Sequence, residues 1–238
     1  KNNDSLAEDI SNFSIHNDVD EFINYIIDKL EDFNFNDDIM IENSNQYYEK
    51  TFKRKTIINK CFKIQEATQQ KCTNCNYLTK LNFNNYVNKI QLSISNDSIS
   101  SISDALHYFS NTKIMEEYNC EKCKTVSTAK ERTIFSILPE YLIIQLLRFN
   151  NDGSKNNKPI NIDKILDFKN YSYNNLDIKY DLTSISCHLD FNHLSGHYIS
   201  FVKNDNKWFI IDDDNVRVAN NFNILTNNSY LLLYKKII

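Results

Sequence analysis

The sequence has few of the residues that usually mark turns, with only two glycines and two prolines among 238 residues. Glycine permits backbone conformations with positive φ, and proline presets turns, so few turns can be assigned from either residue. Asparagine also tolerates left-handed backbone, but it is abundant throughout this chain. Turn positions are therefore predicted mainly from breaks in the hydrophobic pattern.

Long apolar runs and an excess of positive charge are also missing. The longest apolar stretch, Tyr141 to Leu147, is far shorter than the roughly 20 residues of a membrane-spanning helix. A formal net charge of −4 gives no basic field for nucleic acid or an anionic membrane. We expect neither partner, and because no signal peptide opens the chain we expect an intracellular protein, cytoplasmic or nuclear.

The remaining composition is that of a folded protein, with 41% hydrophobic and 24% charged residues. Apolar residues between Asp18 and Asp32 recur at the spacing of one helical face, which predicts a helix. From Ile134 onward the pattern changes to short strands. Helix followed by sheet favours an α+β fold over alternating βαβ units. Asn150 to Asn175, rich in polar residues, is predicted as a surface loop region.

Four of the six cysteines form two C-x-x-C pairs, Cys72 with Cys75 and Cys120 with Cys123. Zinc prefers four ligands in a tetrahedron, and each C-x-x-C turn can present two thiolates to one ion. The alternatives are four ordinary buried cysteines or two redox pairs. The duplicated pairs favour a structural zinc site, since no open ligand position is indicated.

His197 and an acidic run beginning at Asp212 lie in two apolar segments that flank the polar turn Asn204-Asp205-Asn206. A hairpin centred near Asp205 would place the histidine and the carboxylates at the same end of adjacent strands. A carboxylate fixes the tautomer of an imidazole and stabilises its protonated form, as beside a catalytic base. The alternative is a solvated histidine beside an acidic turn.

Several segments, taken together, resemble the ubiquitin-specific protease family. Asn17–Phe22 is similar to its Gln-Asp-Ala-x-Glu-Phe box, and the C-x-x-C pairs are similar to its zinc-binding fingers. Leu138–Phe149 resembles its Leu-Pro-x-x-Leu…Leu-x-Arg-Phe strand. Further similar segments follow in the family's order: Tyr180-Asp181-Leu182, His188, Gly196-His197-Tyr198, Trp208, Asp212-Asp213 and Tyr230–Tyr234.

The resemblance implies a papain-like cysteine protease fold with thumb, palm and fingers, and a thiol-dependent hydrolase that cleaves the bond after the C-terminal glycine of ubiquitin. Residues 1–238 would be a partial catalytic domain, with zinc-binding fingers within about 50–135 and palm strands at about 134–238. The implied roles are as follows: His197 is the general base, with Asp212 as its partner and Asp213 in support, and Asp18, Glu21, His188 and Tyr198 contact the tail of ubiquitin.

Two of these residues carry an alternative role, and one expected residue is missing. Asp18 and Glu21 would face arginines of the tail, but a helix N-terminus favours the same residue types. The family's catalytic cysteine should precede Asp18, yet no cysteine occurs from Lys1 to Ile15. Cys187 and Cys61 are disfavoured as nucleophiles, because a buried cysteine is common.

The missing cysteine leaves two interpretations. The chain is a fragment whose cysteine segment lies elsewhere, or it is an inactive ubiquitin-binding or scaffold module of the same fold. The intact histidine, aspartates and zinc cysteines favour the fragment. The expected partners are ubiquitin and ubiquitinated proteins, together with the missing N-terminal segment or an activating subunit.

Overall fold

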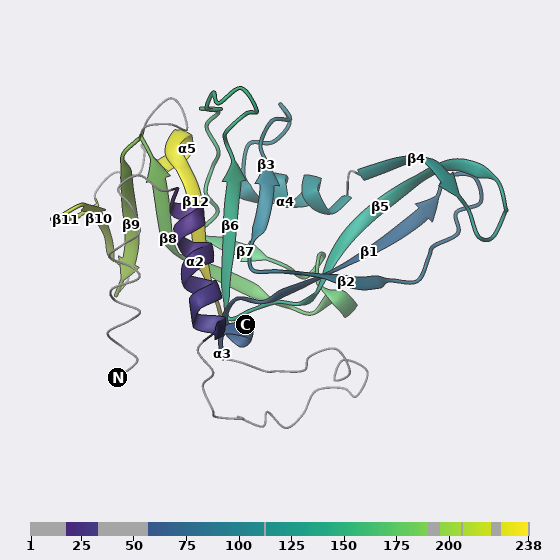
Figure 1. Ribbon diagram of the computed structural model, residues 1–238, viewed down its shortest axis with the longest axis horizontal. Coiled ribbons are helices and arrows are strands. Elements are labelled where there is room, and N and C mark those ends of the chain that lie inside the picture. Colours follow the sequence, from purple (N-terminus) through teal and green to yellow (C-terminus); the bar gives the residue numbers. More distant parts are fainter. Residues whose placement is uncertain are drawn as a thin grey trace. The chain divides into compact units, whose positions relative to one another are not determined.

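The computed structural model describes residues 18–32, 57–111, 113–189, 196–205, 207–219 and 225–237 (Figure 1). The chain divides into two compact units, Lys1–Phe62 and Lys63–Ile238. The first unit contains helices α2 and α3 and no described strand, and the second contains all of the described strands together with helices α4 and α5. The described strands pair mainly antiparallel and carry helices without repeated βαβ units, which confirms the predicted α+β class.

Helix α2, Val19–Asp32, lies in the first unit and confirms the helix predicted from the apolar spacing. It begins at Asp18, whose Oδ1 accepts a hydrogen bond of 2.6 Å from the backbone N–H of Asp20. The carbonyl of Asp18 accepts the first helical bond, 3.1 Å from the N–H of Phe22. Ile27 is buried on one face of α2. The short helix α3, Ile57–Phe62, contacts α2.

A four-stranded antiparallel sheet forms one part of the second unit, in the order β2-β1-β5-β4. Its strands are β1 Ile64–Cys72, β2 Asn82–Val87, β4 Lys113–Asn119 and β5 Val126–Ile137. They lie between residues 64 and 137, close to the range of about 50–135 predicted for the fingers, and we call this sheet the fingers sheet. The long register between β1 and β5, from Gln65 opposite Ile137 to Cys72 opposite Ala129, makes a narrow ribbon (Figure 1).

The second sheet has eight strands, with the path β11-β10-β9-β8-β12-β6-β3 and β7 beside β8. We call it the palm sheet. Its strands are β3 Ile90–Ser93, β6 Tyr141–Leu147, β7 Ile165–Asp167, β8 Lys179–His188, β9 Tyr198–Asn204, β10 Lys207–Asp212, β11 Asn215–Val218 and β12 Ser229–Lys236. Only the β3–β6 pair is parallel. Strand β3 therefore joins the palm sheet although its residues lie within the predicted fingers range.

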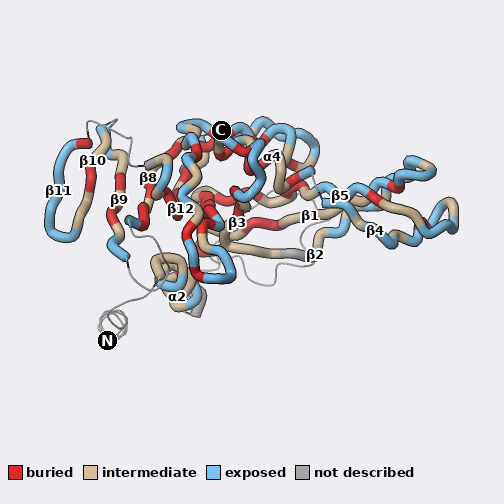
Figure 2. The backbone as a smooth tube through the Cα atoms, turned by 90° about the horizontal axis from the view of Figure 1, so that it is seen from above, coloured by how far each residue is buried: buried red, intermediate tan, exposed pale blue. Residues whose placement is uncertain are grey.

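The main core lies on the palm sheet. Figure 2 shows buried residues along its central strands and mostly exposed residues along β11. Strand β6 is buried at five consecutive residues, Leu142–Leu146. A strand buried on both faces has a nearly continuous apolar sequence. This burial explains why the segment is the longest apolar stretch of the chain. Helix α4, Ile102–Asn111, contacts β3 and β5 and adds Ile102, Ala105 and Leu106 to the core. No helix in the described ranges is long and apolar enough to cross a membrane.

The buried side chain of Arg148 joins the end of β6 to three other segments. Its Nε donates to the carbonyl of Ser229 at 2.5 Å, and its Nη1 donates to the carbonyls of Asn156 and Lys158 at 2.9 and 3.0 Å. Its Nη2 donates to the carbonyl of Thr226 at 2.9 Å. Because burial disfavours the charge, the pKa of Arg148 falls to about 10. Carbonyl groups thus satisfy this buried arginine, a fork geometry that lysine lacks.

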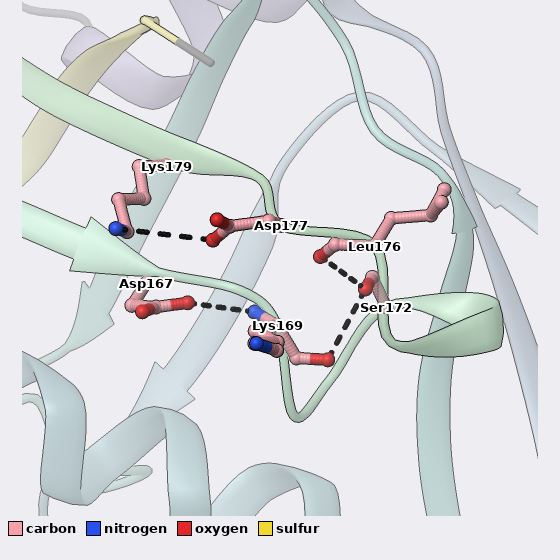
Figure 3. Close-up of polar contacts among 6 residues, drawn as sticks. All are labelled: Asp167, Lys169, Ser172, Leu176, Asp177 and Lys179. Carbon is pink, nitrogen blue, oxygen red and sulfur yellow. Dashed lines mark hydrogen bonds and ion pairs between the residues drawn. The ribbon is translucent and has the colours of Figure 1, made fainter.

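The segment Asn150–Asn175 is more than the predicted surface loop. Lys155, Ile160 and Phe168 are buried within it, and β7 pairs with β8. The prediction was wrong here because a polar composition does not exclude isolated buried anchors. Figure 3 shows the turn that follows β7: Asp167 accepts a bond of 2.8 Å from the N–H of Lys169, and the hydroxyl of Ser172 donates to the carbonyls of Lys169 and Leu176.

A short helix and a 3₁₀ turn complete the second unit. Helix α5, Leu225–Asn228, leads directly into β12 and contacts β8. The 3₁₀ turn η1, Tyr173–Asn175, contains Asn174 and Asn175 with φ of 59° and 52°. Asparagine is the non-glycine residue best suited to this left-handed conformation, so at these positions it takes the place of glycine.

Candidate functional site

His197 and Asp212 are joined by a hydrogen bond between adjacent strands of the palm sheet. His197 directly precedes β9 and Asp212 ends β10. Nε2 of His197 lies 2.5 Å from Oδ1 of Asp212. The two side chains are 47% and 37% exposed, so a reacting group can reach the pair from solvent.

The strand register explains how the two side chains meet. The predicted hairpin is present: Asn204 pairs with Lys207 and Ser200 pairs with Ile211. Extending this register by one residue sets Asp212 opposite Ile199, so His197 is its diagonal neighbour on the same face. Diagonal neighbours lie about 7–8 Å apart at the backbone, within reach of long side chains.

The carboxylates change the acid–base behaviour of His197. The hydrogen bond to Asp212 raises the pKa of His197 above its ordinary value of 6.5; slight burial opposes this, and the charges of Asp213 and Asp212 add to it. Asp213 lies in the turn from β10 to β11 with φ of 49°. An imidazole in this setting can accept a proton and hold it as an imidazolium beside a carboxylate.

His197, Asp212 and Asp213 also lie close enough together to hold a metal ion. However, His197 and Asp213 are exposed, and the imidazole Nε2 already bonds to Asp212. Exposed acidic groups of this kind are common, so the group does not by itself indicate a metal site.

Gly196, which precedes His197 in the sequence, packs so closely against the ring of His188 that only a residue without a side chain fits there. A Cβ at Gly196 would lie 2.0 Å from Nε2 of His188. The backbone carbonyl of the next residue, His197, accepts a bond of 2.9 Å from the N–H of Leu189. The ring of His188 and the end of β8 therefore fix the backbone that carries His197.

His188 and Tyr198, both predicted to contact the ubiquitin tail, pack against each other. Their ring centroids lie 5.0 Å apart, and the ring of Phe149 lies 5.2 Å from that of His188 on an edge-to-face approach. His188 is only 3% exposed, and its carbonyl accepts a hydrogen bond from the ammonium of Lys155. The observed packing gives His188 a supporting position, and its contact with a ubiquitin tail stays a prediction.

Asp18 and Glu21 belong to the first compact unit. Asp18 caps helix α2 as described above, which is the alternative role that the sequence left open. Glu21 is exposed in the first turn of α2, where a negative charge is favoured by the helix dipole. Their contact with ubiquitin also stays a prediction.

The six cysteines offer no well-placed nucleophile among the described residues. Cys187 is fully buried, and burial raises its pKa to about 12, although Arg148 and Lys155 oppose this. The thiolate is the nucleophilic form, so Cys187 is inert in this state. Cys61 lies on α3 in the other unit, and the remaining four form a separate cluster.

Cys72, Cys75, Cys120 and Cys123 come together at one end of the fingers sheet, with all four sulfurs within 4.8 Å of one another. The Sγ atoms of Cys75 and Cys120 lie 3.6 Å apart, and those of Cys72 and Cys123 lie 4.0 Å apart. Four thiolates at about 2.3 Å from a zinc ion are spaced by roughly 3.8 Å in a tetrahedron. The cluster therefore fits zinc.

The two C-x-x-C turns have the same backbone geometry. The N–H of Asn76 donates to the carbonyl of Cys72 at 3.0 Å, and the N–H of Lys124 donates to the carbonyl of Cys120 at 2.9 Å. Asn76 and Lys124 have φ of 57° and 58°. Two equivalent turns facing each other are what a tetrahedral ion requires. Hydrogen bonds from the side chain and backbone of Thr125 lower the pKa of Cys123 to about 6, which favours its thiolate. The pKa of Cys75 is instead raised to about 11, because the backbone bond from Tyr77 is outweighed by burial and by the neighbouring cysteines.

Sequence reasoning missed three contributors to these sites. Asn76 carried a usable signal, an asparagine directly after a C-x-x-C pair, but the abundance of asparagine hid it. Lys124 carried none, because lysine has no preference for left-handed backbone. The contact between Gly196 and His188 crosses two strands, so no local pattern could reveal it.

Comparison with known proteins gives relatives of one kind. Ubiquitin carboxyl-terminal hydrolase 16 of Arabidopsis thaliana is 29% identical over 229 residues, which cover 92% of this chain and 22% of that protein. Ubiquitin carboxyl-terminal hydrolase 42 of Homo sapiens is 25% identical over 229 residues, covering 93% of this chain and 16% of that protein. The chain thus spans about a fifth of the length of these relatives.

Solved structures agree on the fold. The SAGA DUB module of Ubp8, Sgf11, Sus1 and Sgf73 bound to monoubiquitin contains a chain that matches with a TM-score of 0.78 at 24% identity. The match covers 98% of this chain and 51% of that one. The α+β fold predicted from the resemblance, with its fingers, is therefore confirmed.

The family itself is identified by sequence. The sequence pattern of the ubiquitin carboxyl-terminal hydrolases matches residues 2–234, nearly the whole chain. The chain belongs to the ubiquitin carboxyl-terminal hydrolase family.

Proposed function

We propose that this chain provides the general base and the zinc-binding fingers of a thiol-dependent deubiquitinase. The proposal depends chiefly on the hydrogen bond of 2.5 Å between His197 and Asp212, found in a member of a hydrolase family. The substrate would be the isopeptide or peptide bond after the C-terminal glycine of ubiquitin.

The geometry of the pair assigns the two ring nitrogens. Nε2 of His197 donates to Asp212, so Nδ1 is the basic nitrogen that would take the proton of a thiol. The thiolate would attack the carbonyl carbon, and the imidazolium would then protonate the leaving amine as the bond to nitrogen breaks. Water activated by the same imidazole would release the ubiquitin carboxylate. Asp212 stabilises the imidazolium, and the charge of Asp213 supports it.

The nucleophile in this scheme is a cysteine other than the six in this sequence. The buried state of Cys187 and the metal-like cluster of four cysteines support that assignment. It would be supplied by a further segment of the same protein or by another polypeptide. Ubiquitin and ubiquitinated proteins would be the partners, with an activating subunit as a further candidate.

The fingers would hold one structural zinc ion through Cys72, Cys75, Cys120 and Cys123. Bound there, the ion would cross-link the turn after β1 to the turn between β4 and β5. The chain's own contribution is to present two matched turns at one end of the sheet. The ion would have no part in hydrolysis, since all four ligand positions are filled by sulfur.

The alternative is a ubiquitin-binding or scaffold module of the same fold without catalysis. A ubiquitin probe with a C-terminal electrophile separates the two. The chain alone should not be labelled, and the chain fused to a cysteine-bearing segment of the full protein should be labelled. His197→Ala in the fused protein should abolish hydrolysis of a ubiquitin conjugate. Labelling of the chain alone at Cys187 or Cys61 would contradict the proposal, and failure of the fused protein to react would favour the binding module.

A further inference from the structure

One face of the fingers sheet places two lysines directly opposite each other. Lys71 of β1 pairs with Lys130 of β5, and both are exposed. Arg132, two residues along β5, lies on the same face because side chains alternate along a strand. Like charges opposite each other destabilise a sheet. The arrangement therefore costs stability unless something outside the sheet compensates it.

No carboxylate in the described part of the chain pairs with these three cations. Within the described ranges, Arg132 donates only to the amide oxygen of Gln69, through Nε at 3.0 Å and Nη2 at 2.7 Å. The chain as a whole carries a net charge of −4, so this is a local basic area on an acidic protein.

On the opposite face of the same strands, charged side chains are paired. There Glu131 lies between Gln70 and Lys113, directly opposite each of them. Its carboxylate accepts a bond of 2.6 Å from the amide of Gln70 and forms an ion pair of 2.7 Å with Lys113. The sheet therefore matches charges across strands on one face and leaves them unmatched on the other.

Exposed apolar side chains border the unmatched lysines. Leu78 forms a bridge with Lys71, and Ile114 pairs with Lys130, so both share the face of the lysines. They are 49% and 59% exposed, and Val126, on the same face of β5 by alternation, is 71% exposed. Across the strands the order is apolar, basic, basic, apolar, over about 14 Å at the usual strand spacing.

We infer that this face, formed by Lys71, Lys130, Arg132, Leu78, Ile114 and Val126, docks an acidic segment of a partner protein that carries apolar side chains beside its carboxylates. The row of two lysines between two apolar residues fits two carboxylates between two apolar residues. Nucleic acid fits less well, because an acidic chain repels it and half of the face is apolar. The inference goes beyond ubiquitin hydrolysis and does not rest on it.

The test uses the zinc-loaded chain and a fluorescein-labelled peptide with two glutamates between two leucines. The matched control peptide has glutamine in place of each glutamate. We expect anisotropy to report binding of the glutamate peptide, weakening as salt is added because exposed charges are screened. The glutamine peptide should bind about tenfold more weakly, because it loses the charge-assisted bonds.

Two variants separate docking from stability. Lys130→Glu creates an opposite-charge pair with Lys71, so its melting temperature should stay or rise while peptide affinity falls about tenfold or more. Lys113→Gln breaks the ion pair on the other face, so its melting temperature should fall while peptide affinity is unchanged.

Four results would overturn the inference. Lys130→Glu could bind the glutamate peptide as tightly as the parent chain does, or lose stability along with binding. The glutamine peptide could bind equally well, which would leave only apolar contact. Monoubiquitin could displace the peptide competitively, which would make this face part of a ubiquitin contact.

Discussion

His197 illustrates at the residue scale how a single hydrogen bond changes both chemistry and stability. Its pKa is raised chiefly by the bond to Asp212, so the folded state binds a proton more tightly than the unfolded state does. That contribution to stability is fully present below the ordinary pKa of 6.5 and is lost as pH rises through the raised value. The side chain is 47% exposed, so we expect a small effect.

Asp212→Asn should lower the pKa of His197 toward its ordinary value. NMR titration of the imidazole ring protons measures this directly. The melting temperature of Asp212→Asn should fall relative to the parent at pH 5.5, and the difference should shrink as pH rises through the raised pKa of His197. An unchanged His197 titration would show that the pair does not form in solution.

Gly196 gives a second residue-scale prediction. Gly196→Ala introduces a Cβ at 2.0 Å from Nε2 of His188, and His188 is held between Phe149 and Tyr198. We expect a loss of about 1–3 kcal/mol in the free energy of unfolding, the usual cost of overpacking. Urea denaturation followed by tryptophan fluorescence gives the value.

The control for this variant is the double substitution with His188→Ala. Removing the imidazole makes room for the new methyl group, so the two changes should be less costly together than their sum. Additive costs would mean that the steric contact with His188 is not the reason for glycine at this position.

At the scale of elements, we expect the fingers sheet to depend on its cluster of four cysteines. Its distal end buries only a few side chains, among them Cys72, Cys120 and Ala129. Cys120→Ser should therefore abolish stoichiometric zinc and raise amide hydrogen exchange in β4 and β5, while β6 and β12 stay protected. Elemental analysis and hydrogen exchange by mass spectrometry measure these effects.

Cys61→Ser is the matched control, because Cys61 lies on α3 outside the cluster. It should change neither the zinc content nor the exchange of β4 and β5. A purified chain without zinc, or fingers equally protected in Cys120→Ser, would contradict the zinc assignment.

Helix α2 allows its cap and its charge to be separated. Asp18→Ala should lower the free energy of unfolding by about 1 kcal/mol, because the N–H of Asp20 loses its acceptor. Asp18→Asn keeps a capping oxygen and should retain that stability. Urea denaturation compares the two variants.

The same pair of variants tests the proposed contact of Asp18 with the ubiquitin tail. Both should bind monoubiquitin more weakly than the parent if the carboxylate pairs with arginine, and calorimetry measures the difference. If Asp18→Asn binds as tightly as the parent, capping is the only role of this residue.

On the scale of the whole molecule, Cys187 reports on the palm sheet. It lies on β8, paired with Ile199 of β9 on one side and Ser229 of β12 on the other. Because it is fully buried and its pKa is about 12, iodoacetamide should modify it only where the sheet unfolds. Mass spectrometry of peptides alkylated at increasing urea should show Cys187 reacting together with the global transition. Reaction in native conditions would mean that the end of β8 opens locally.

The sequence predicted those features that short-range patterns specify. Apolar spacing predicted α2, the continuous apolar run predicted β6, and the duplicated C-x-x-C pairs predicted the cluster of four cysteines. The polar turn at Asp205 predicted the hairpin that brings His197 and Asp212 to the same end. Each depends on residues whose spacing along the chain is itself the geometric signal.

Only the tertiary structure decided the rest, because it depends on contacts between distant segments. Gly196 is required by His188 on another strand, and Arg148 finds its acceptors in α5, β12 and a loop that composition assigned to the surface. Strand β3 lies in the sequence between two strands of the fingers sheet, but it pairs with β6 of the palm sheet. The unmatched face of the fingers arises from the β1–β5 register. A one-residue slip in that register would have set each lysine beside a different neighbour, and no sequence pattern in either strand fixes it.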